Sequence, residues 1–219
     1  MIRICPSILN ANFDDLPGEI EKVASTADLI HLDVMDNVFV PNFTFSPERT
    51  REIIDFSTLP IDVHLMVAEV DGKVNQYSSE NAVSMTVHFE ACQDPLQTLK
   101  NIRSLGKRAG LAIKPDTPIE VVEELLPAID MIVVMTVEPG FGGQSFMASM
   151  MPKVEKARRY LEQRKLNDVW LQIDGGISLS TIETARRAGA DTFVAGSAVY
   201  KSENPGSMVE QLRTLANNC

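Results

Sequence analysis

Ile30-His31-Leu32-Asp33-Val34-Met35-Asp36 has the alternating pattern of a β-strand with one chemically functional face. Residues two apart in a strand point the same way, so His31, Asp33 and Met35 share one face, and the apolar residues between them pack on the other. An imidazole and a carboxylate on one face can bind a metal ion or transfer a proton. An amphipathic surface strand with a capping Asp explains this heptapeptide equally well when it is taken alone.

Length and composition indicate a globular protein with a sizeable core. The chain has 219 residues, of which 44% are hydrophobic and 23% charged, and this argues against a largely disordered chain. Barrels of alternating strands and helices occupy roughly 200–250 residues as one domain, so a single domain is allowed at this length. The three cysteines, Cys5, Cys92 and Cys219, are widely spaced and lack metal-site spacing, and we interpret them as reduced thiols.

Charge and hydropathy disfavour several classes of partner. A formal net charge of −10 without a basic stripe argues against binding to nucleic acid or to an anionic membrane surface. A small phosphorylated ligand is still compatible with this charge, because backbone amides at helix starts can hold phosphate without Lys or Arg. The sequence shows no leader pattern and no apolar run near the ~20 residues of a membrane span, so we expect a cytoplasmic protein.

Short β-rich runs alternate with amphipathic helical stretches along the whole chain. The predicted strands cover residues 3–9, 29–34, 61–66, 84–89, 108–113, 131–136, 169–173 and 192–195. The predicted helices cover residues 16–25, 47–56, 70–79, 95–105, 119–126, 148–164, 179–188 and 207–216. Strict alternation favours a parallel sheet, and eight units predict a single-domain (β/α)8 TIM barrel over residues 1–219. An open doubly wound α/β sheet is the alternative, but no G-x-G-x-x-G turn follows the first strand.

The barrel prediction places many polar residues at one end of the molecule, because active sites of this fold lie at the carboxyl ends of the strands. Those ends here carry Ser7, His31, Asp33, His64, His88, Lys114, Thr136, Asp174 and the Gly196-Ser197 turn. All three histidines of the chain fall in this set, which a random scatter would rarely produce. Each of them alone is equally consistent with a hydrogen-bonded core histidine.

A second predicted strand repeats the pattern of the first stretch. In Asp62-Val63-His64-Leu65-Met66, an ionisable residue is followed by a histidine two positions on and by a methionine two further. Together with Asp33 and Asp174, the two inward histidines would form a two-His, two-carboxylate ligand set for one divalent ion. Asp62 lies one layer deeper, where we expect a structural partner rather than a ligand.

Glycine-bearing loops follow three neighbouring strands. Asp174 is followed by Gly175 and Gly176, the sixth strand by Glu138-Pro139-Gly140-Phe141-Gly142-Gly143-Gln144-Ser145, and the eighth strand by Gly196-Ser197. A tight turn explains each loop separately. Together they could make an amide-lined anion pocket, and the loops after strands seven and eight are the usual phosphate site of this fold.

Methionines mark the ends of three strands. They are Met35, Met66 and Met135. Such soft, uncharged side chains could wall an active site without offering protons, and ordinary core packing explains them equally well.

Taken together, these segments resemble the ribulose-phosphate 3-epimerase family over nearly the whole chain. The resemblance rests on residues 5–9, 30–36, 39–42, 62–67, 110–115, 135–144, 173–177 and 194–198. The long loop Met135-Thr136-Val137-Glu138-Pro139-Gly140-Phe141-Gly142-Gly143-Gln144 is the most specific of these motifs. The sequence departs from the family's pattern at Asn37 and Val38, where Gly-His is common, although Asn tolerates the left-handed conformation that Gly would supply.

The resemblance implies roles for individual residues. The implied ligands of one divalent metal ion per chain, which could be Zn, Fe, Mn or Co, are His31, Asp33, His64 and Asp174. Asp33 and Asp174 are also the implied acid and base. The expected substrate-binding residues are Ser7, His64, Met35, Met66, Met135, Gly142, Gly143, Gly175, Gly176, Gly196 and Ser197.

The implied activity is the interconversion of D-ribulose 5-phosphate and D-xylulose 5-phosphate by two-base proton transfer at carbon 3 through an enediolate. A base on one face and an acid on the other is the simplest way to invert a carbon next to a ketone, and two carboxylates on well-separated strands suit it. The alternatives are a 3-epimerase of a six-carbon ketose phosphate such as allulose 6-phosphate and a non-catalytic phosphosugar-binding barrel. We expect a small phosphosugar substrate, no nucleic-acid or membrane partner, and a homo-oligomer.

Overall fold

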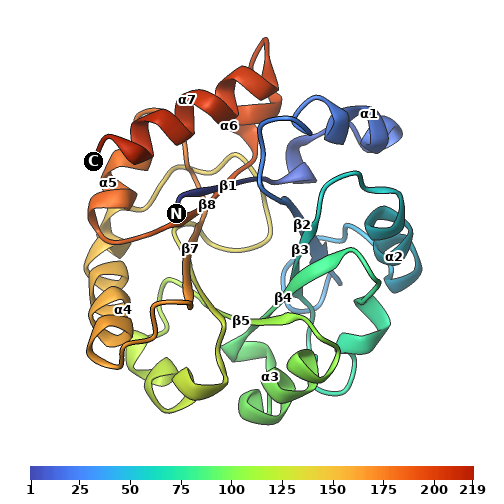
Figure 1. Ribbon diagram of the computed structural model, residues 1–219. Helices are drawn as coiled ribbons and strands as arrows, with labels where there is room; N and C mark the ends of the chain where they lie inside the picture. The colour runs from blue at the N-terminus through green and yellow to red at the C-terminus, as the bar shows by residue number, and fades with distance from the viewer.

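The computed structural model describes residues 1–219, and its strands form one parallel sheet. The strands are β1 (Arg3–Pro6), β2 (Ile30–Met35), β3 (Ile61–Met66), β4 (Ala82–His88), β5 (Arg108–Ile113), β6 (Met131–Met135), β7 (Trp170–Asp174) and β8 (Thr192–Ala195). Neighbours pair in the order β1-β8-β7-β6-β5-β4-β3-β2. An isolated parallel bridge between Ser7 and His31 joins β1 to β2, so the sheet curls into a nearly closed eight-stranded barrel (Figure 1). The predicted TIM barrel is confirmed.

Helices follow the strands and surround the barrel on the outside (Figure 1). The α-helices are α1 (Leu16–Glu21), α2 (Pro47–Phe56), α3 (Pro95–Ser104), α4 (Met151–Gln163), α5 (Ile182–Arg187), α6 (Ser197–Tyr200) and α7 (Pro205–Asn217). The 3-10 helices are η1 (Ile8–Asn10), η2 (Phe13–Asp15), η3 (Val74–Tyr77), η4 (Phe89–Ala91), η5 (Ile119–Ala128) and η6 (Ala148–Met150). None of these helices is both long enough and apolar enough to span a membrane.

Local sequence explains where the longer helices begin. Ser46, Asp94 and Asn204 each accept a backbone N–H from the third helical residue, and a proline occupies the first helical position after each of them. A side-chain oxygen at this place satisfies a donor that the helix leaves unpaired, and proline there has no N–H to lose. These caps fix the starts of α2, α3 and α7.

The strand predictions agree with the structure except at their ends. The bounds of β3, β5, β8 and α2 are as predicted. The first strand, predicted to run to Leu9, ends at Pro6, because the Ser7 side chain accepts the Leu9 backbone N–H and caps a 3-10 turn. The other strands differ from their predicted bounds by one or two residues at one or both ends.

Two predicted helices have a different form. Within the predicted helix 70–79, only Val74–Tyr77 is helical, as η3, because Gly72 has a φ of 73° that a right-handed helix does not continue through. The helix predicted over 119–126 is the 3-10 helix η5, and Pro127 inside it supplies no backbone N–H. The first prediction was therefore too long, and the second was right in position although the helix has the 3-10 form.

Other helices differ in extent. Helices α1 and α5 are shorter than the predicted ranges 16–25 and 179–188. The predicted helix 148–164 is divided into η6 and α4, while α3 and α7 differ from their predictions by one or two residues at an end. Helix α6 has only four residues, too few to give an amphipathic period, and the sequence pattern did not predict it.

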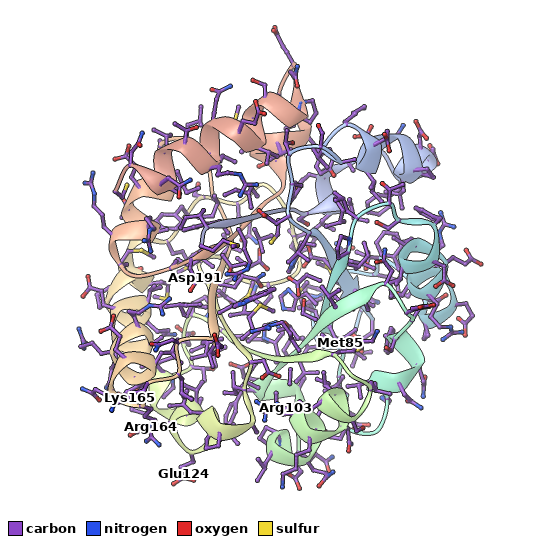
Figure 2. All side chains as sticks on the ribbon, viewed as in Figure 1. Met85, Arg103, Glu124, Arg164, Lys165 and Asp191 are labelled. Atoms are coloured by element: carbon purple, nitrogen blue, oxygen red, sulfur yellow. The ribbon has the colours of Figure 1, made fainter.

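The main hydrophobic core joins the sheet to the surrounding helices and contains 54 buried residues. Side chains also fill the centre of the ring of strands, so the barrel is packed rather than a channel (Figure 2). Several buried residues of the strands are polar, including Asp62, Ser84 and Gln172. Because a buried polar group needs a partner, these side chains are available to orient others inside the barrel.

Candidate metal centre and active site

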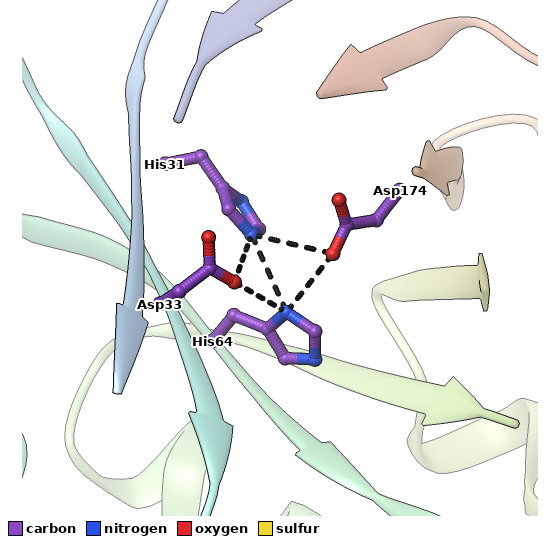
Figure 3. A group of neighbouring side chains, drawn as sticks. All are labelled: His31, Asp33, His64 and Asp174. Carbon is purple, nitrogen blue, oxygen red and sulfur yellow. Dashed lines mark hydrogen bonds and ion pairs between the residues drawn. The ribbon is translucent and has the colours of Figure 1, made fainter. Parts of the chain in front are cut away.

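Four side chains converge at the carboxyl end of the barrel (Figure 3). His31 and Asp33 come from β2, His64 from β3, and Asp174 from the last position of β7. His64 Nδ1 lies 3.2 Å from Asp33 Oδ1 and 3.3 Å from Asp174 Oδ2, and His31 Nε2 lies 3.2 Å from Asp33 Oδ1. Ligand atoms of all four residues lie within 4.8 Å of one another. The fold therefore brings together the four residues that the sequence singled out.

The geometry and chemistry of this cluster fit a divalent metal ion. His31 Nε2 and His64 Nδ1 lie 3.3 Å apart and face the same two carboxylates. Both histidines are fully buried, and the Asp33 and Asp174 side chains are only 5% and 13% exposed. Two carboxylates withdrawn from water need compensating positive charge, and imidazole nitrogens with carboxylate oxygens are donors that first-row divalent ions bind.

Strong interactions within the cluster shift the pKa values of its members. Burial opposes a charge on His31, but the Asp33 and Asp62 carboxylates raise the pKa of His31 well above its ordinary value. Burial also opposes a charge on Asp33, yet His31 and His64 hold the pKa of Asp33 far below its ordinary range. The pKa of His64 is raised as well, because Asp174 and Asp33 outweigh its burial. The two carboxylates thus favour positive charge at the centre of the cluster.

Asp62 lies behind His31 and fixes its orientation. The His31 Nδ1–H group donates to Asp62 Oδ2 at 2.8 Å, which leaves Nε2 facing the cluster. Ser84 Oγ and Gln172 Nε2 donate to the two oxygens of Asp62 at 2.6 and 2.9 Å. Because Asp62 is fully buried, these bonds satisfy a carboxylate that water cannot reach. Asp62 is therefore a structural partner of His31, as the sequence predicted.

Ser7 holds the second oxygen of Asp33. Its hydroxyl donates to Asp33 Oδ2 at 2.6 Å, while Oδ1 of the same carboxylate faces the two histidines. Ser7 also forms the isolated bridge to His31, so this hydrogen bond crosses the seam between β1 and β2. The Asp33 carboxylate is therefore fixed through both of its oxygens.

The third histidine continues the network outward. His64 Nε2 lies 3.0 Å from His88 Nε2, and His88 Nδ1 lies 3.3 Å from Glu90 Oε2. Burial lowers the pKa of His88 to about 4. Burial would raise the pKa of Glu90, but hydrogen bonds from His88 and Thr117 hold it at about 2. A neutral imidazole therefore links His64 to an ionised carboxylate.

A pocket opens above the cluster, with about 510 Å³ of empty space that includes its solvent-filled mouth. Asp33 and Asp174 line it, whereas His31 and His64 are buried beneath the lining. The predicted substrate-binding residues in the lining are Ser7, Met35, Met66, Met135, Gly142, Gly143, Gly175, Gly176, Gly196 and Ser197. His64 is the one predicted substrate contact outside the lining, and that contact stays a prediction.

Backbone conformation explains two glycines of the pocket, and close packing of loops adds a second reason at one of them. Gly143 and Gly176 have φ values of 75° and 68°, in the left-handed region that favours glycine. A Cβ on Gly176 would lie 2.5 Å from the Phe146 backbone nitrogen, so the loop after β7 packs directly on the loop after β6. Because glycines have no side chains, backbone atoms form much of the pocket wall here. Backbone N–H groups in such a wall can bind an anion.

Asn10 lines the same pocket, although it was not among the predicted site residues. Its side-chain oxygen would lie 2.6 Å from a Cβ on Gly142 and 2.5 Å from one on Gly196, so Asn10 fills the gap between two glycine loops. The available signal was a polar residue three positions after Ser7, just beyond the predicted strand. The other lining residues that were not named as substrate contacts are Leu9, Val137, Ile177, Val194 and four members of the predicted anion-binding loop, Pro139, Gly140, Phe141 and Gln144.

Besides the three histidines, Thr136 and Lys114 are predicted strand-end residues that do not line the pocket. Thr136 Oγ1 donates to the Asp174 backbone oxygen at 3.1 Å and so ties β6 to the end of β7. Lys114 Nζ lies 4.0 Å from the centre of the Phe39 ring, a cation–π contact. In the loop after β2, Asn37 has a φ of 59°, the left-handed conformation expected where the family often has Gly.

Sequence comparison relates the chain to one enzyme family. Residues 3–200 match the model of the ribulose-phosphate 3 epimerase family. The chain is 38% identical to the ribulose-phosphate 3-epimerase of Bacillus subtilis, in an alignment that covers 97% of this chain and 99% of that protein. It is 42% identical to the ribulose-phosphate 3-epimerase of Mycobacterium leprae, with 97% of this chain and 94% of that protein covered.

Solved structures with low sequence identity share the barrel. KGPDC from Streptococcus mutans superposes with a TM-score of 0.72 at 14% identity and covers 100% of this chain and 98% of that chain. N-(5'-phosphoribosyl)anthranilate isomerase from Pyrococcus furiosus gives a TM-score of 0.65 at 16% identity, with full coverage of both chains. These likenesses concern the fold alone. By the family match and the near full-length identities, the chain belongs to the ribulose-phosphate 3-epimerase family.

Proposed function

We propose that this chain is a metal-dependent epimerase that interconverts D-ribulose 5-phosphate and D-xylulose 5-phosphate. The proposal is carried by the placement of Asp33 and Asp174, which line one pocket and reach a single buried cluster from two sides (Figure 3). In the sheet, β1 and β8 separate β2 from β7, so the two carboxylates come from well-separated strands. The names of the Bacillus and Mycobacterium relatives support the same substrate.

Two carboxyl groups on opposite faces of a bound sugar can invert a carbon next to a ketone. One carboxylate removes the proton of carbon 3, which leaves an enediolate with negative charge on the former ketone oxygen. The other carboxyl group, in its protonated form, delivers a proton to the opposite face. Asp33 and Asp174 exchange these roles in the reverse reaction, and the Ser7 hydroxyl keeps Asp33 in place.

The ligand atoms of the cluster would be His31 Nε2, His64 Nδ1, Asp33 Oδ1 and Asp174 Oδ2. A bound divalent ion supplies positive charge that can stabilise a developing oxyanion by several kcal/mol. The surrounding protein keeps the imidazoles oriented and excludes water from the two histidines, which are fully buried.

The glycine loops would hold the phosphate at the other side of the pocket. Gly143, Gly176 and Gly196 belong to loops after three consecutive strands, β6, β7 and β8, and all three line the pocket. A phosphate fixed there would place carbon 3 of the sugar between the two carboxylates. Both proton transfers would then take place between groups already held in position, which lowers the entropic part of the barrier. The three methionines would wall the site without adding a competing acid.

Incubation of the purified protein with D-ribulose 5-phosphate tests the proposal. We expect D-xylulose 5-phosphate to form with at least one of Zn, Fe, Mn or Co, to stop on chelation, and to resume when the ion is restored. If no D-xylulose 5-phosphate forms with any of these four ions, the proposed activity is wrong. D-Allulose 6-phosphate, assayed in parallel, tests the sugar: a higher kcat/KM for this six-carbon ketose phosphate would replace the pentose substrate.

A further inference from the structure

The outer edge of the His64 ring contacts a hydrogen-bonded chain that the proposed reaction does not use. His64 Nδ1 faces the cluster, and His64 Nε2 lies 3.0 Å from His88 Nε2. His88 is fully buried, and its Nδ1 lies 3.3 Å from Glu90 Oε2. Neither His88 nor Glu90 lines the pocket, so neither contacts a ligand held there.

The geometry of this chain fixes where each imidazole carries its proton. His64 must present a lone pair at Nδ1 to bind a metal ion, so its ring proton lies on Nε2. Two ring nitrogens 3.0 Å apart need one donor and one acceptor, hence His88 Nε2 accepts and His88 Nδ1 carries the proton. That proton faces Glu90 Oε2, a carboxylate oxygen that can only accept. The donors therefore run in one direction, from His64 through His88 to Glu90.

Glu90 is anchored at its far end by the loop after β5. Its other oxygen, Oε1, accepts the Lys114 backbone N–H at 2.9 Å and the Thr117 hydroxyl. Lys153 of α4 donates in turn to the carbonyl oxygens of Lys114 and Thr117, at 3.0 and 2.7 Å, and so holds that loop in place. Glu90 thus offers His88 a fixed acceptor rather than a mobile surface carboxylate.

We propose that His88 and Glu90 form a positioning relay for His64, an inference that rests on the metal site of the proposed function. The relay holds the His64 ring in the tautomer and orientation that direct Nδ1 into the cluster. Asp62 does the same for His31, with a carboxylate in direct contact with the ring. Outer partners of this kind typically contribute about 10–100-fold to metal affinity.

The protonation sites are directly observable in zinc-loaded protein with 15N-labelled histidine, because the chain has only three histidines. Two-bond 15N–1H spectra should show His64 protonated at Nε2 and both His31 and His88 protonated at Nδ1. A His88 ring protonated at Nε2 in the zinc-loaded protein would overturn the relay, since that nitrogen could not then accept from His64.

Substitution of His88 separates positioning from packing. Gln can place its amide oxygen where His88 has Nε2, whereas Leu fills space without an acceptor. We expect His88→Leu to weaken zinc binding by about 10–100-fold, measured by competition with a chromophoric chelator, and His88→Gln to stay within about threefold of wild type. Equal weakening in both variants, or none in His88→Leu, would contradict a role through hydrogen bonding.

The Glu90→Gln variant provides a second test of the relay in case the His88→Leu protein does not fold. It removes the charge that His88 faces, and Asp116→Asn removes one exposed charge from the neighbouring loop as a matched control. Zinc affinity should fall in Glu90→Gln and stay unchanged in Asp116→Asn, and equal affinities would count against the relay. These measurements use zinc without substrate, so a protein that passes them but does not epimerise ribulose 5-phosphate would refute the proposed function and leave the relay standing.

Discussion

At the scale of single residues, Asp33 and Asp174 differ in how firmly they are held. Asp33 is 5% exposed, and Ser7 binds its second oxygen at 2.6 Å. Asp174 is 13% exposed and ends β7 directly before two glycines. One carboxylate is thus fixed in the pocket wall on the β2 side, and the other lies at the start of a glycine turn on the β7 side.

Asp33→Asn and Asp174→Asn should each lower kcat by at least roughly 10²–10⁴-fold, the usual contribution of a positioned acid or base. The loss should be larger if the metal ion is lost too, so metal content is measured beside kcat. In deuterated water, a variant that keeps one working base can still exchange the substrate proton on that face without inverting the carbon. Near wild-type inversion by either variant, with its metal retained, would disprove the two-base assignment.

Gly176→Ala should raise KM, whereas Gly106→Ala should not. Both glycines have left-handed φ values, 68° and 75°, so an alanine at either costs about 1–3 kcal/mol of backbone strain. The difference lies in the surroundings, because a Cβ on Gly176 would meet the Phe146 backbone at 2.5 Å and one on Gly106 would meet nothing within 4 Å. Steady-state kinetics with metal analysis compare the pair, and equal KM values would show that this loop does not hold the phosphate.

At the scale of elements, carboxylates tie helices to the amino ends of the strands. Asp130 precedes β6 and accepts two bonds from Arg103 of α3, at 2.8 and 3.0 Å, and the Ala109 backbone N–H at 2.9 Å. Asp191 precedes β8 and accepts from Arg158 of α4 at 2.7 Å. These contacts lie at the end of the barrel away from the pocket, where this fold places its stabilising residues.

Asp130→Asn should destabilise the protein in a pH-dependent way. Burial would raise the pKa of Asp130, but Arg103 and the Ala109 N–H hold it below its ordinary value. The pKa of Asp130 is therefore lower in the folded state than in the unfolded state, where it is about 3.9. The resulting stabilisation is fully present above the unfolded-state pKa, and it is lost as the pH falls through the folded-state pKa. We expect a loss of roughly 1 kcal/mol at neutral pH, with screening by solvent allowed for.

Urea unfolding of wild type and Asp130→Asn between neutral and acidic pH measures this difference. The gap between the two unfolding free energies should narrow below about pH 4. Arg103→Gln supplies the double-mutant cycle, in which the coupling between the two side chains should vanish over the same range. A gap that stays constant with pH would show that the ion pair does not stabilise the fold.

At the scale of the whole molecule, the barrel has one weak seam. Between β1 and β2 the structure has only the isolated bridge of Ser7 with His31, while every other neighbouring pair forms a ladder. The Ser7 hydroxyl bond to Asp33 crosses the same seam. The proposed ligands come from β2, β3 and β7, which lie on both sides of it. A metal ion bound by them would therefore close the barrel as well as serve the reaction.

Removal of the metal ion should destabilise the protein and loosen this seam first. An ion at 100 times its Kd adds about 2.7 kcal/mol to the unfolding free energy, and for a chain of this size each kcal/mol shifts Tm by roughly 2–4 °C. Calorimetry with and without chelator measures the shift, and hydrogen exchange locates it. Amides of β1 and β2 should exchange faster without the ion than those of β4, β5 and β6, and a uniform change along the sheet would contradict closure by the metal.

The barrel and the end of it that carries the candidate site were both predictable from the sequence alone. Strict alternation of eight strands and helices leaves few parallel arrangements, and strand periodicity puts His31 and Asp33 on one face. Since all parallel strands of a barrel end at the same rim, His64 and Asp174 could be assigned to the same place without coordinates. These inferences succeeded because they depend on local periodicity and on one general rule of the fold.

The hydrogen bonds and packing that support these residues could not be predicted from the sequence. The bond from Gln172 to Asp62 joins residues 110 positions apart, and the contact between His64 and His88 joins two separate strands. Asn10 enters the pocket because two glycine loops more than 100 residues later in the chain, at Gly142 and Gly196, leave it room. No local pattern encodes such contacts, because they depend on the distances and side-chain directions that packing sets once the barrel has closed.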